Sequence, residues 1–316
     1  MNLMADPQSD TEGRLRHLLT LNGLGRERIV ALLDRGAALR DAYRGGTLPP
    51  LLAGRTVMNL FFEASTRTRT SFELAAHRLG AFVVNFDIAN SSTSKGESLE
   101  DTLATLEAMD ADAFIVRHKE NGTPARFAAH ARRAVIVNAG DGNHAHPTQG
   151  LLDLLTIRDH KGDVEGLNVT ICGDVRHSRV ARSDIHGLSA LGANEIRLCG
   201  PAALLPSATE FPECRIVGSF DEALDGSDVI IMLRLQKERI EGVLGLGEAE
   251  YFAAYGLTGE RLARAREDAI VMHPGPMNRG VEIADDVADG PRSVILDQVA
   301  NGIFVRMAVL AELLRV

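Results

Sequence analysis

The chain has 316 residues, of which 45% are apolar and 24% charged, and its formal net charge is −9. This length exceeds one ordinary core and predicts two domains of roughly 100–200 residues each. The negative balance argues against general nucleic-acid binding, which needs a basic face. No apolar run reaches the roughly 20 residues that span a bilayer, and the polar, acidic start is unlike a signal peptide.

Strands and helices alternate through the first half. Apolar runs predict strands at 57–62, 83–86, 113–116 and 135–138, and periodic patterns predict helices at 70–79, 99–109 and 125–133. Alternation of this kind implies a parallel sheet with helices on both faces.

The second half repeats this style. Helices are predicted at 151–161 and 178–191, strands at 168–172, 195–198, 229–233 and 270–272, and a final amphipathic helix at about 298–314. The best domain boundary lies near residues 149–150, where a loop leads into the long helix.

The three cysteines, Cys172, Cys199 and Cys214, are an odd number without framework spacing. This predicts free thiols, mostly buried as small apolar residues, in a reducing cytosol.

Ligands bind open parallel sheets outside the carboxyl ends of the strands. Ser65-Thr66-Arg67-Thr68-Arg69 follows the first strand and leads into a helix. A helix N-terminus offers N–H groups and a positive dipole end to phosphate, and hydroxyls and guanidinium groups add strong donors. The alternative is a capped surface helix with solvated arginines. Because arginine is unfavourable in a first helical turn, phosphate binding is the favoured interpretation.

Other strand ends of the first half are also polar or basic. The loop at 91–97 contains the single cation Lys95 and by itself is typical of a solvated loop. Arg117 follows the third strand, and a glycine-containing loop after the fourth leads to His144 and His146. This H-x-H pair has no matching His or Cys cluster elsewhere, so a hydrogen bond from neutral His146 to a polarised carbonyl oxygen is favoured over a metal site.

The second half adds basic or proline-rich segments after its strands, at 173–179, 234–239 and 273–276. The first lacks G-x-G-x-x-G, so nicotinamide binding is disfavoured, and the chain has no G-x-S-x-G elbow, Walker loop or H-E-x-x-H motif. Together the strand ends predict one anion-binding crevice between two domains. Such a site works by positioning and charge stabilisation rather than through a covalent nucleophile.

These motifs resemble the transcarbamoylases. The segment 65–69 resembles the family's carbamoyl phosphate signature, and H-P-T-Q at 146–149, R-L-Q-K-E-R at 234–239 and H-P-G-P at 273–276 resemble its aspartate branch. The resemblance implies an α/β fold of two domains, each a mostly parallel sheet flanked by helices, with the C-terminal helix packing on the first. Residues 1–149, joined by helix 297–316, would bind carbamoyl phosphate, and residues 150–296 would bind aspartate.

The resemblance also implies a role for each matching residue. Arg67, Thr68, Arg117 and His146 would be catalytic. Carbamoyl phosphate would be bound by these four with Ser65, Thr66 and Gln149, and by Ser91 and Lys95 of a neighbouring subunit. Aspartate would be bound by Lys95, Arg179, Arg234 and Gln236, with backbone contacts from Gly275 and Pro276. No metal or organic cofactor is implied.

The implied reaction transfers the carbamoyl group of carbamoyl phosphate to L-aspartate, within pyrimidine biosynthesis, in a cytoplasmic homotrimer with shared sites. Regulatory or dihydroorotase-like subunits are possible further partners, whereas nucleic acid and membrane are not expected. One alternative is ornithine carbamoyl transfer, but that branch has cysteines where this chain has Thr148 and Gly275. The other alternative, a non-catalytic paralogue, would have lost the arginines or the histidine, and these are present.

Overall fold

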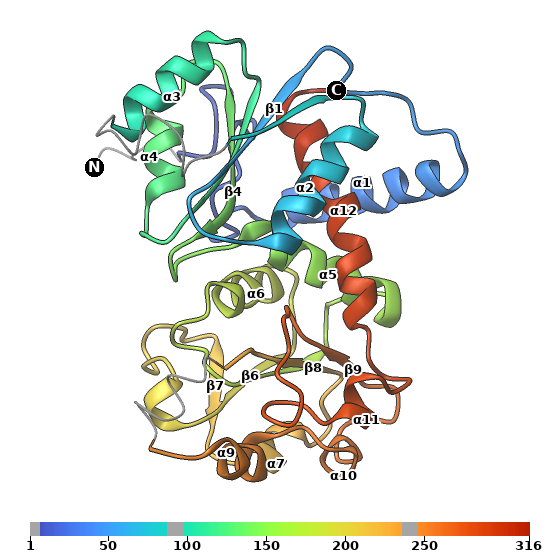
Figure 1. Ribbon diagram of the computed structural model, residues 1–316. Coiled ribbons are helices and arrows are strands. Elements are labelled where there is room, and N and C mark those ends of the chain that lie inside the picture. The colour runs from blue at the N-terminus through green and yellow to red at the C-terminus, as the bar shows by residue number, and fades with distance from the viewer. Residues whose placement is uncertain (1–6, 87–97, 236–244) are drawn as a thin grey trace. The chain divides into compact units, whose positions relative to one another are not determined.

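The computed structural model describes residues 7–86, 98–235 and 245–316. The chain divides into two compact units, Met1–Leu152 with Asn301–Val316, and Asp153–Ala300. Both divisions fall inside helices, α5 (Pro147–Lys161) and α12 (Ile295–Leu313). Each unit contains one parallel sheet with helices packed on it (Figure 1), which confirms the predicted fold class.

The sheet of the first unit has the strand order β2-β1-β3-β4, and all its pairs are parallel. The strands are β1 (Thr56–Phe61), β2 (Phe82–Asn85), β3 (Ala113–His118) and β4 (Val135–Asp141). Strand addition reverses direction between β1 and β3. The connections that leave these two strands therefore diverge, and this is the place where open sheets bind ligands.

Helices cover both faces of this sheet (Figure 1). They are α1 (Arg26–Arg44), α2 (Thr66–Arg78), α3 (Leu99–Ala108) and α4 (Thr123–His130), together with the end of α12. On one face, Leu103 of α3 and Phe127 of α4 pack against Phe114 of β3 in an aliphatic and aromatic core. Burial of this kind contributes about 25 cal/mol per Å² of apolar surface.

On the other face, α12 packs against α1 and α2. The rings of Tyr43 in α1 and Phe304 in α12 lie 5.9 Å apart, and the guanidinium of Arg78 in α2 lies 4.1 Å from the Tyr43 ring centre. The C-terminal helix therefore packs on the first unit, as predicted from the sequence.

A buried carboxylate ties α3 to the start of β4. Glu107 Oε1 accepts backbone N–H bonds from Arg132, Arg133 and Ala134 at 3.0, 2.6 and 2.8 Å. Burial alone would raise the pKa of Glu107, but these N–H groups lower it below its ordinary value of 4.5.

Glu107→Ala should therefore lower the free energy of unfolding by about 2 kcal/mol near pH 7, because buried N–H groups lose a charged acceptor. A lowered folded-state pKa means that this stabilisation is present above pH 4.5 and is lost as the pH falls below it. Urea unfolding near pH 7 and near pH 4 measures both effects. The wild type should have the larger free energy of unfolding at pH 7, and its lead over Glu107→Ala should shrink at pH 4. Equal values at pH 7, or a difference that grows as the pH falls, would contradict this account.

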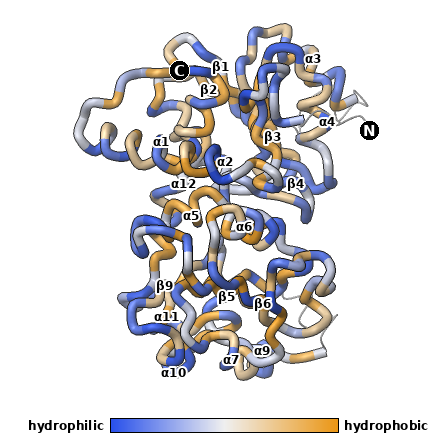
Figure 2. The backbone as a smooth tube through the Cα atoms, turned by 180° about the vertical axis from the view of Figure 1, so that it is seen from behind, coloured by the Kyte–Doolittle hydropathy of each residue, from blue (hydrophilic) through white to orange (hydrophobic). Residues whose placement is uncertain are grey.

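The sheet of the second unit has the order β7-β6-β5-β8-β9, again all parallel. Its strands are β5 (Asn168–Cys172), β6 (Glu195–Cys199), β7 (Cys214–Val217), β8 (Val229–Met232) and β9 (Ile270–Met272). Besides the parts of α5 and α12 that belong to this unit, its described helical segments are α6 (Arg179–Ala190), η2 (Ala202–Leu204), α7 (Phe220–Leu224), α9 (Glu248–Tyr255), α10 (Gly259–Leu262) and α11 (Asp285–Ala288). The central strands are mainly hydrophobic (Figure 2), as parallel strands covered on both faces require.

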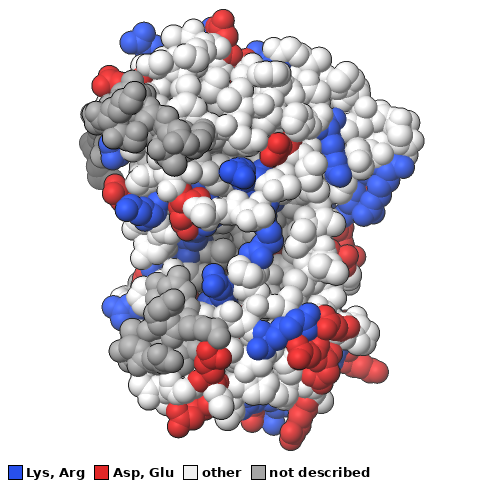
Figure 3. Space-filling model, in the orientation of Figure 1, with Lys and Arg blue, Asp and Glu red and all other residues white. Residues whose placement is uncertain are grey.

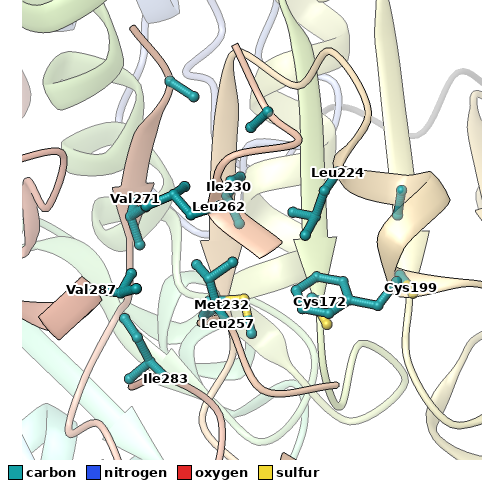
Figure 4. Packing of buried hydrophobic residues seen from close by; sticks show 14 of the residues in the cluster. Cys172, Cys199, Leu224, Ile230, Met232, Leu257, Leu262, Val271, Ile283 and Val287 are labelled. Carbon is teal, nitrogen blue, oxygen red and sulfur yellow. The ribbon is translucent and has the colours of Figure 1, made fainter. Parts of the chain in front are cut away.

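The core of this unit lies against the central strands (Figure 4). Strand residues Cys172, Ile230, Met232 and Val271 belong to one buried cluster with Leu224, Leu257, Leu262, Ile283 and Val287. Cys172 pairs in register with Cys199, and both are free and buried, whereas Cys214 is free and partly buried. The predicted free thiols are thus confirmed.

Basic and acidic side chains lie together on the second unit around α11 (Figure 3). There Arg279 pairs with Asp285 at 2.9 Å and with Asp289 at 2.7 Å. Because these side chains are exposed, water and salt screen their attraction and the pairs contribute little to stability. Within the described part of the chain, no helix has the length and apolar character needed to cross a bilayer.

Candidate active site

The segment Ser65–Arg69 forms the N-terminal end of α2. Ser65 is the N-cap residue, so the helix begins at Thr66 and the predicted start at residue 70 is wrong. The Ser65 side chain makes no capping hydrogen bond, and the first turn contains no acidic residue. A first turn has no intrahelical acceptors for its N–H groups. Together with exposed Arg67, this end of α2 has the charge and donors that suit a phosphate.

Arg117 lies beside this turn, across the point where strand addition reverses. It is the next-to-last residue of β3, and its side chain is buried. Its guanidinium donates to Glu63 Oε1 at 2.9 Å and to the Ala139 carbonyl at 3.3 Å. The backbone N–H of Phe62 donates to the Arg117 carbonyl at 2.8 Å, which joins the β1 end to the β3 end. From the sequence alone Glu63 has no assigned role, although it lies two residues before the phosphate-type segment Ser65–Arg69.

His146 follows β4 at the same edge of the sheet. A turn closed by the bond from Asp141 N–H to the Ala145 carbonyl, at 3.0 Å, leads to buried His146 and into α5. Gly142 in this turn has a φ of 49°, in the left-handed region that favours glycine, and a Cβ there would displace the Asn121 side chain, whose Oδ1 would lie 1.9 Å away. Gln149 stands in the first turn of α5, and its N–H donates to the His146 carbonyl at 2.9 Å.

The other histidine of the H-x-H pair has a different environment. The Nδ1 atom of His144 lies 2.9 Å from Asp141 Oδ2 within the same turn. Among the residues with described positions, no three His, Cys, Asp or Glu side chains form a group that could hold a metal.

In the second unit, Arg179 and Arg234 flank the reversal point between β5 and β8. Ser178 caps α6 by accepting from Ala181 N–H at 3.1 Å, which makes Arg179 the first helical residue. Exposed Arg234 comes shortly after β8. The chain after β5 approaches the chain after β8 closely at Gly173. A Cβ added to this glycine would lie only 3.1 Å from the Leu233 carbonyl oxygen. Both arginines therefore lie at the carboxyl edge of one sheet.

The segment 273–276 follows β9, the neighbour of β8. Gly275 has a φ of 64°, in the left-handed region that favours glycine, and the Gly275–Pro276 peptide is cis. The structure thus groups Ser65, Thr66, Arg67, Thr68, Arg117, His146 and Gln149 in the first unit, and Arg179, Arg234, Gly275 and Pro276 in the second. Ser91, Lys95 and Gln236 lie outside the described residues.

Two family models match the chain. The carbamoyl-phosphate-binding domain of aspartate/ornithine carbamoyltransferases matches residues 16–159, and the Asp/Orn-binding domain matches residues 165–313. The chain belongs to the aspartate/ornithine carbamoyltransferase family. It is therefore a carbamoyltransferase, as the sequence motifs predicted.

Relatives within this family share most of the sequence. The aspartate carbamoyltransferase catalytic subunit of Xanthomonas campestris is 57% identical over 98% of this chain and 100% of its own length. The subunit of the same name from Stenotrophomonas maltophilia is 56% identical over 98% of this chain and its own full length.

Solved structures share the fold. Aspartate transcarbamoylase from Trypanosoma cruzi, in complex with N-(phosphonacetyl)-L-aspartic acid, is 33% identical with a TM-score of 0.85, covering 96% of this chain and 97% of that one. Ornithine carbamoyltransferase from Pyrococcus furiosus is 27% identical, also with a TM-score of 0.85, covering 95% and 97%. The fold therefore does not distinguish aspartate carbamoyltransferases from ornithine carbamoyltransferases. The residues that would bind the second substrate have to distinguish them.

Proposed function

We propose that the chain transfers the carbamoyl group of carbamoyl phosphate to the α-amine of L-aspartate, which yields N-carbamoyl-L-aspartate and phosphate. The observation that carries this proposal is the 57% identity, over the full length of the relative, to a catalytic subunit named for aspartate. Local chemistry agrees, because Arg179 and Arg234 suit a dicarboxylate and would repel the cationic side chain of ornithine.

The first unit supplies the groups for the electrophile. Arg67, Ser65, Thr66 and the N-terminal end of α2 bind the phosphate, while Thr68, Arg117 and His146 donate to the carbamoyl oxygen and Gln149 contacts the carbamoyl amide. The uncharged amine attacks the carbonyl carbon, and negative charge grows on its oxygen. Each donor aimed at that oxygen contributes about 3 kcal/mol in the transition state. The bond between the carbonyl carbon and the phosphate oxygen then breaks, phosphate leaves with the bonding pair, and it takes up the proton that the amine loses.

Arg117 needs a change of partner in this scheme. Its guanidinium donates to Glu63 Oε1 at 2.9 Å in the structure, which keeps the buried cation paired. Carbamoyl phosphate brings its own negative charge to the same turn. We propose that the ligand takes over part of the pairing that Glu63 provides.

The second unit supplies the groups for the nucleophile. Arg179 and Arg234 bind the two carboxylates with help from Gln236, and the backbone of Gly275 and Pro276 contacts the substrates. The reacting atoms of the two substrates must come within about 3 Å of each other for the amine to attack. In this proposal, residues 1–149 with helix 297–316 bind carbamoyl phosphate, and residues 150–296 bind aspartate.

The wider setting follows the family resemblance. The proposal includes a cytoplasmic homotrimer that works in pyrimidine biosynthesis, with Ser91 and Lys95 completing a neighbouring site. The free thiols support a reducing compartment. Regulatory or dihydroorotase-like subunits are candidate partners, because the relatives are named catalytic subunits.

Product analysis tests the proposed reaction. The purified protein is incubated with labelled carbamoyl phosphate and either aspartate or ornithine. The expected product is N-carbamoyl-aspartate, with no detectable citrulline. Citrulline as the main product would favour the ornithine branch, and the absence of turnover with both amines would favour a non-catalytic paralogue.

The shared site has its own test. Lys95→Ala and Arg67→Ala should each inactivate the enzyme, because each removes a cation from every site. When the two inactive chains are mixed and reassembled, some sites combine an intact Arg67 with an intact Lys95 from the neighbour, and activity should partly return. Mixed trimers verified by native mass spectrometry that remain inactive would rule out site sharing.

A further inference from the structure

A buried carboxylate in the second unit bonds to both ends of the loop that contains Gly275 and Pro276, beside the proposed aspartate site. The Glu282 side chain has 0% exposure and lies between β9 and α11. Its Oε1 accepts the backbone N–H of Asn278 at 2.5 Å and lies 3.1 Å from His273 Nε2. His273 and Asn278 lie on either side of Gly275 and Pro276. Glu282 thus closes the loop that presents these two residues.

The bonds around His273 determine its tautomer. The Gly275 N–H donates to His273 Nδ1 at 2.8 Å, and since a backbone N–H can only donate, Nδ1 carries no proton. The proton of the neutral ring is therefore on Nε2, which donates to Glu282. The His273 backbone N–H donates to Gln298 Oε1 at 2.9 Å, and Gln298 Nε2 donates to Asp153 Oδ1 at 2.7 Å. Hydrogen bonds therefore hold both the ring and the backbone of His273 in place.

A second branch from Glu282 reaches the segment that contains Arg234. The Asn278 backbone is bound by Glu282, and its side-chain Nδ2 donates to the Leu235 carbonyl at 2.9 Å. Leu235 directly follows Arg234 and is buried in a small cluster with Tyr251 and Val281. Since β8 and β9 are neighbours (Figure 1), this bond ties the connections that leave the two strands to each other.

We propose that Glu282 is a positioning residue for the second substrate. Through His273 it fixes the backbone of Gly275 and Pro276, and through Asn278 it fixes the segment of Arg234. A fully buried carboxylate is costly to desolvate, and an apolar side chain would fill this space without that cost. The inference rests on the proposed function, because that proposal assigns both segments to aspartate. Glu282 itself does not contact substrate.

Glu282→Gln tests this role. The amide keeps the size of the side chain but removes its charge, and it places an NH2 donor at the position of Oε2, a buried atom that has no hydrogen-bond partner among the described residues. We expect the KM for aspartate to rise about tenfold, as misplaced binding groups require, while the dissociation constant of carbamoyl phosphate stays within about twofold. Asn278→Ala removes only the branch to Leu235 and should raise the KM for aspartate less. It also provides the test if Glu282→Gln does not fold.

Asp228→Asn is the matched control. Asp228 is also a buried carboxylate of this unit, bonded to Asn168 N–H at 2.9 Å and Arg266 Nε at 3.0 Å, but it directly precedes β8, at the opposite edge of the sheet. It should lose stability with no change in the KM for aspartate. Three results would overturn the inference. The KM for aspartate could rise equally in Glu282→Gln and Asp228→Asn, or stay unchanged in folded Glu282→Gln. Alternatively, Glu282→Gln could lose affinity for carbamoyl phosphate to the same extent. If the wild type fails to carbamoylate aspartate, the proposed function fails instead.

Discussion

Arg67→Ala should reduce turnover by about 10³-fold or more while the fold survives. Arg67 is exposed in the first turn of α2, so its removal takes little from the core. The proposed phosphate loses a charge-assisted donor both when it binds and when it departs with its full charge. Steady-state kinetics and circular dichroism on the same sample measure activity and fold.

Arg69→Ala is the matched control for this result. Arg69 is also exposed, lies two positions further along the same helix and has no assigned role. It should retain most of the wild-type activity. Equal losses in the two variants would show only a general effect of positive charge near α2. Normal activity in Arg67→Ala would remove the phosphate-binding assignment.

Arg234→Ala should raise the dissociation constant of a bisubstrate analogue with one phosphonate and two carboxylates. The expected rise is about 10²-fold, which corresponds to about 2.7 kcal/mol of binding free energy. The affinity for carbamoyl phosphate should remain nearly unchanged, because its groups lie in the first unit. The analogue unites the binding contributions of both substrates, so the wild type should bind it far more tightly than either substrate alone. Calorimetric titration with the analogue and with carbamoyl phosphate separates the two effects.

Arg176→Ala is the control here, since Arg176 is exposed, follows β5 in the same unit and has no assigned role. Its affinity for the analogue should match the wild type. If Arg234→Ala lost carbamoyl phosphate binding but kept its response to aspartate, the substrates assigned to the two units would have to be exchanged.

The sequence predicts buried strands well, whether central like β5 or at the sheet edge like β9, because their apolar pattern is local. Strands β5 and β9 have the predicted bounds, since each is an apolar run that polar residues or glycine terminate. Strand β7 was not predicted, because two of its four residues are exposed at the sheet edge and its apolar signal is weak. Helix α1 was also missed, although buried Ile29, Leu32, Leu33 and Leu39 have helical spacing, because many charged residues separate them.

The candidate site shows the same division between local and tertiary information. The position of Ser65–Arg69 after a strand predicts an anion site. The predicted helix begins at residue 70 rather than at Thr66, because arginine is unfavourable in a first helical turn. Glu63 and Glu282 were not selected. Their partners Arg117 and His273 lie 54 and 9 positions away in the sequence, and only the folded chain brings them within hydrogen-bonding distance.

A crystal structure with the bisubstrate analogue tests the central claim most directly. The account predicts that the phosphonate binds at Ser65–Thr68, at the N-terminal end of α2, and that the carboxylates bind Arg179 and Arg234. The carbonyl oxygen should lie within hydrogen-bonding distance of Thr68, Arg117 and His146. A phosphonate bound among residues of the second unit, or carboxylates that contact neither arginine, would contradict the account.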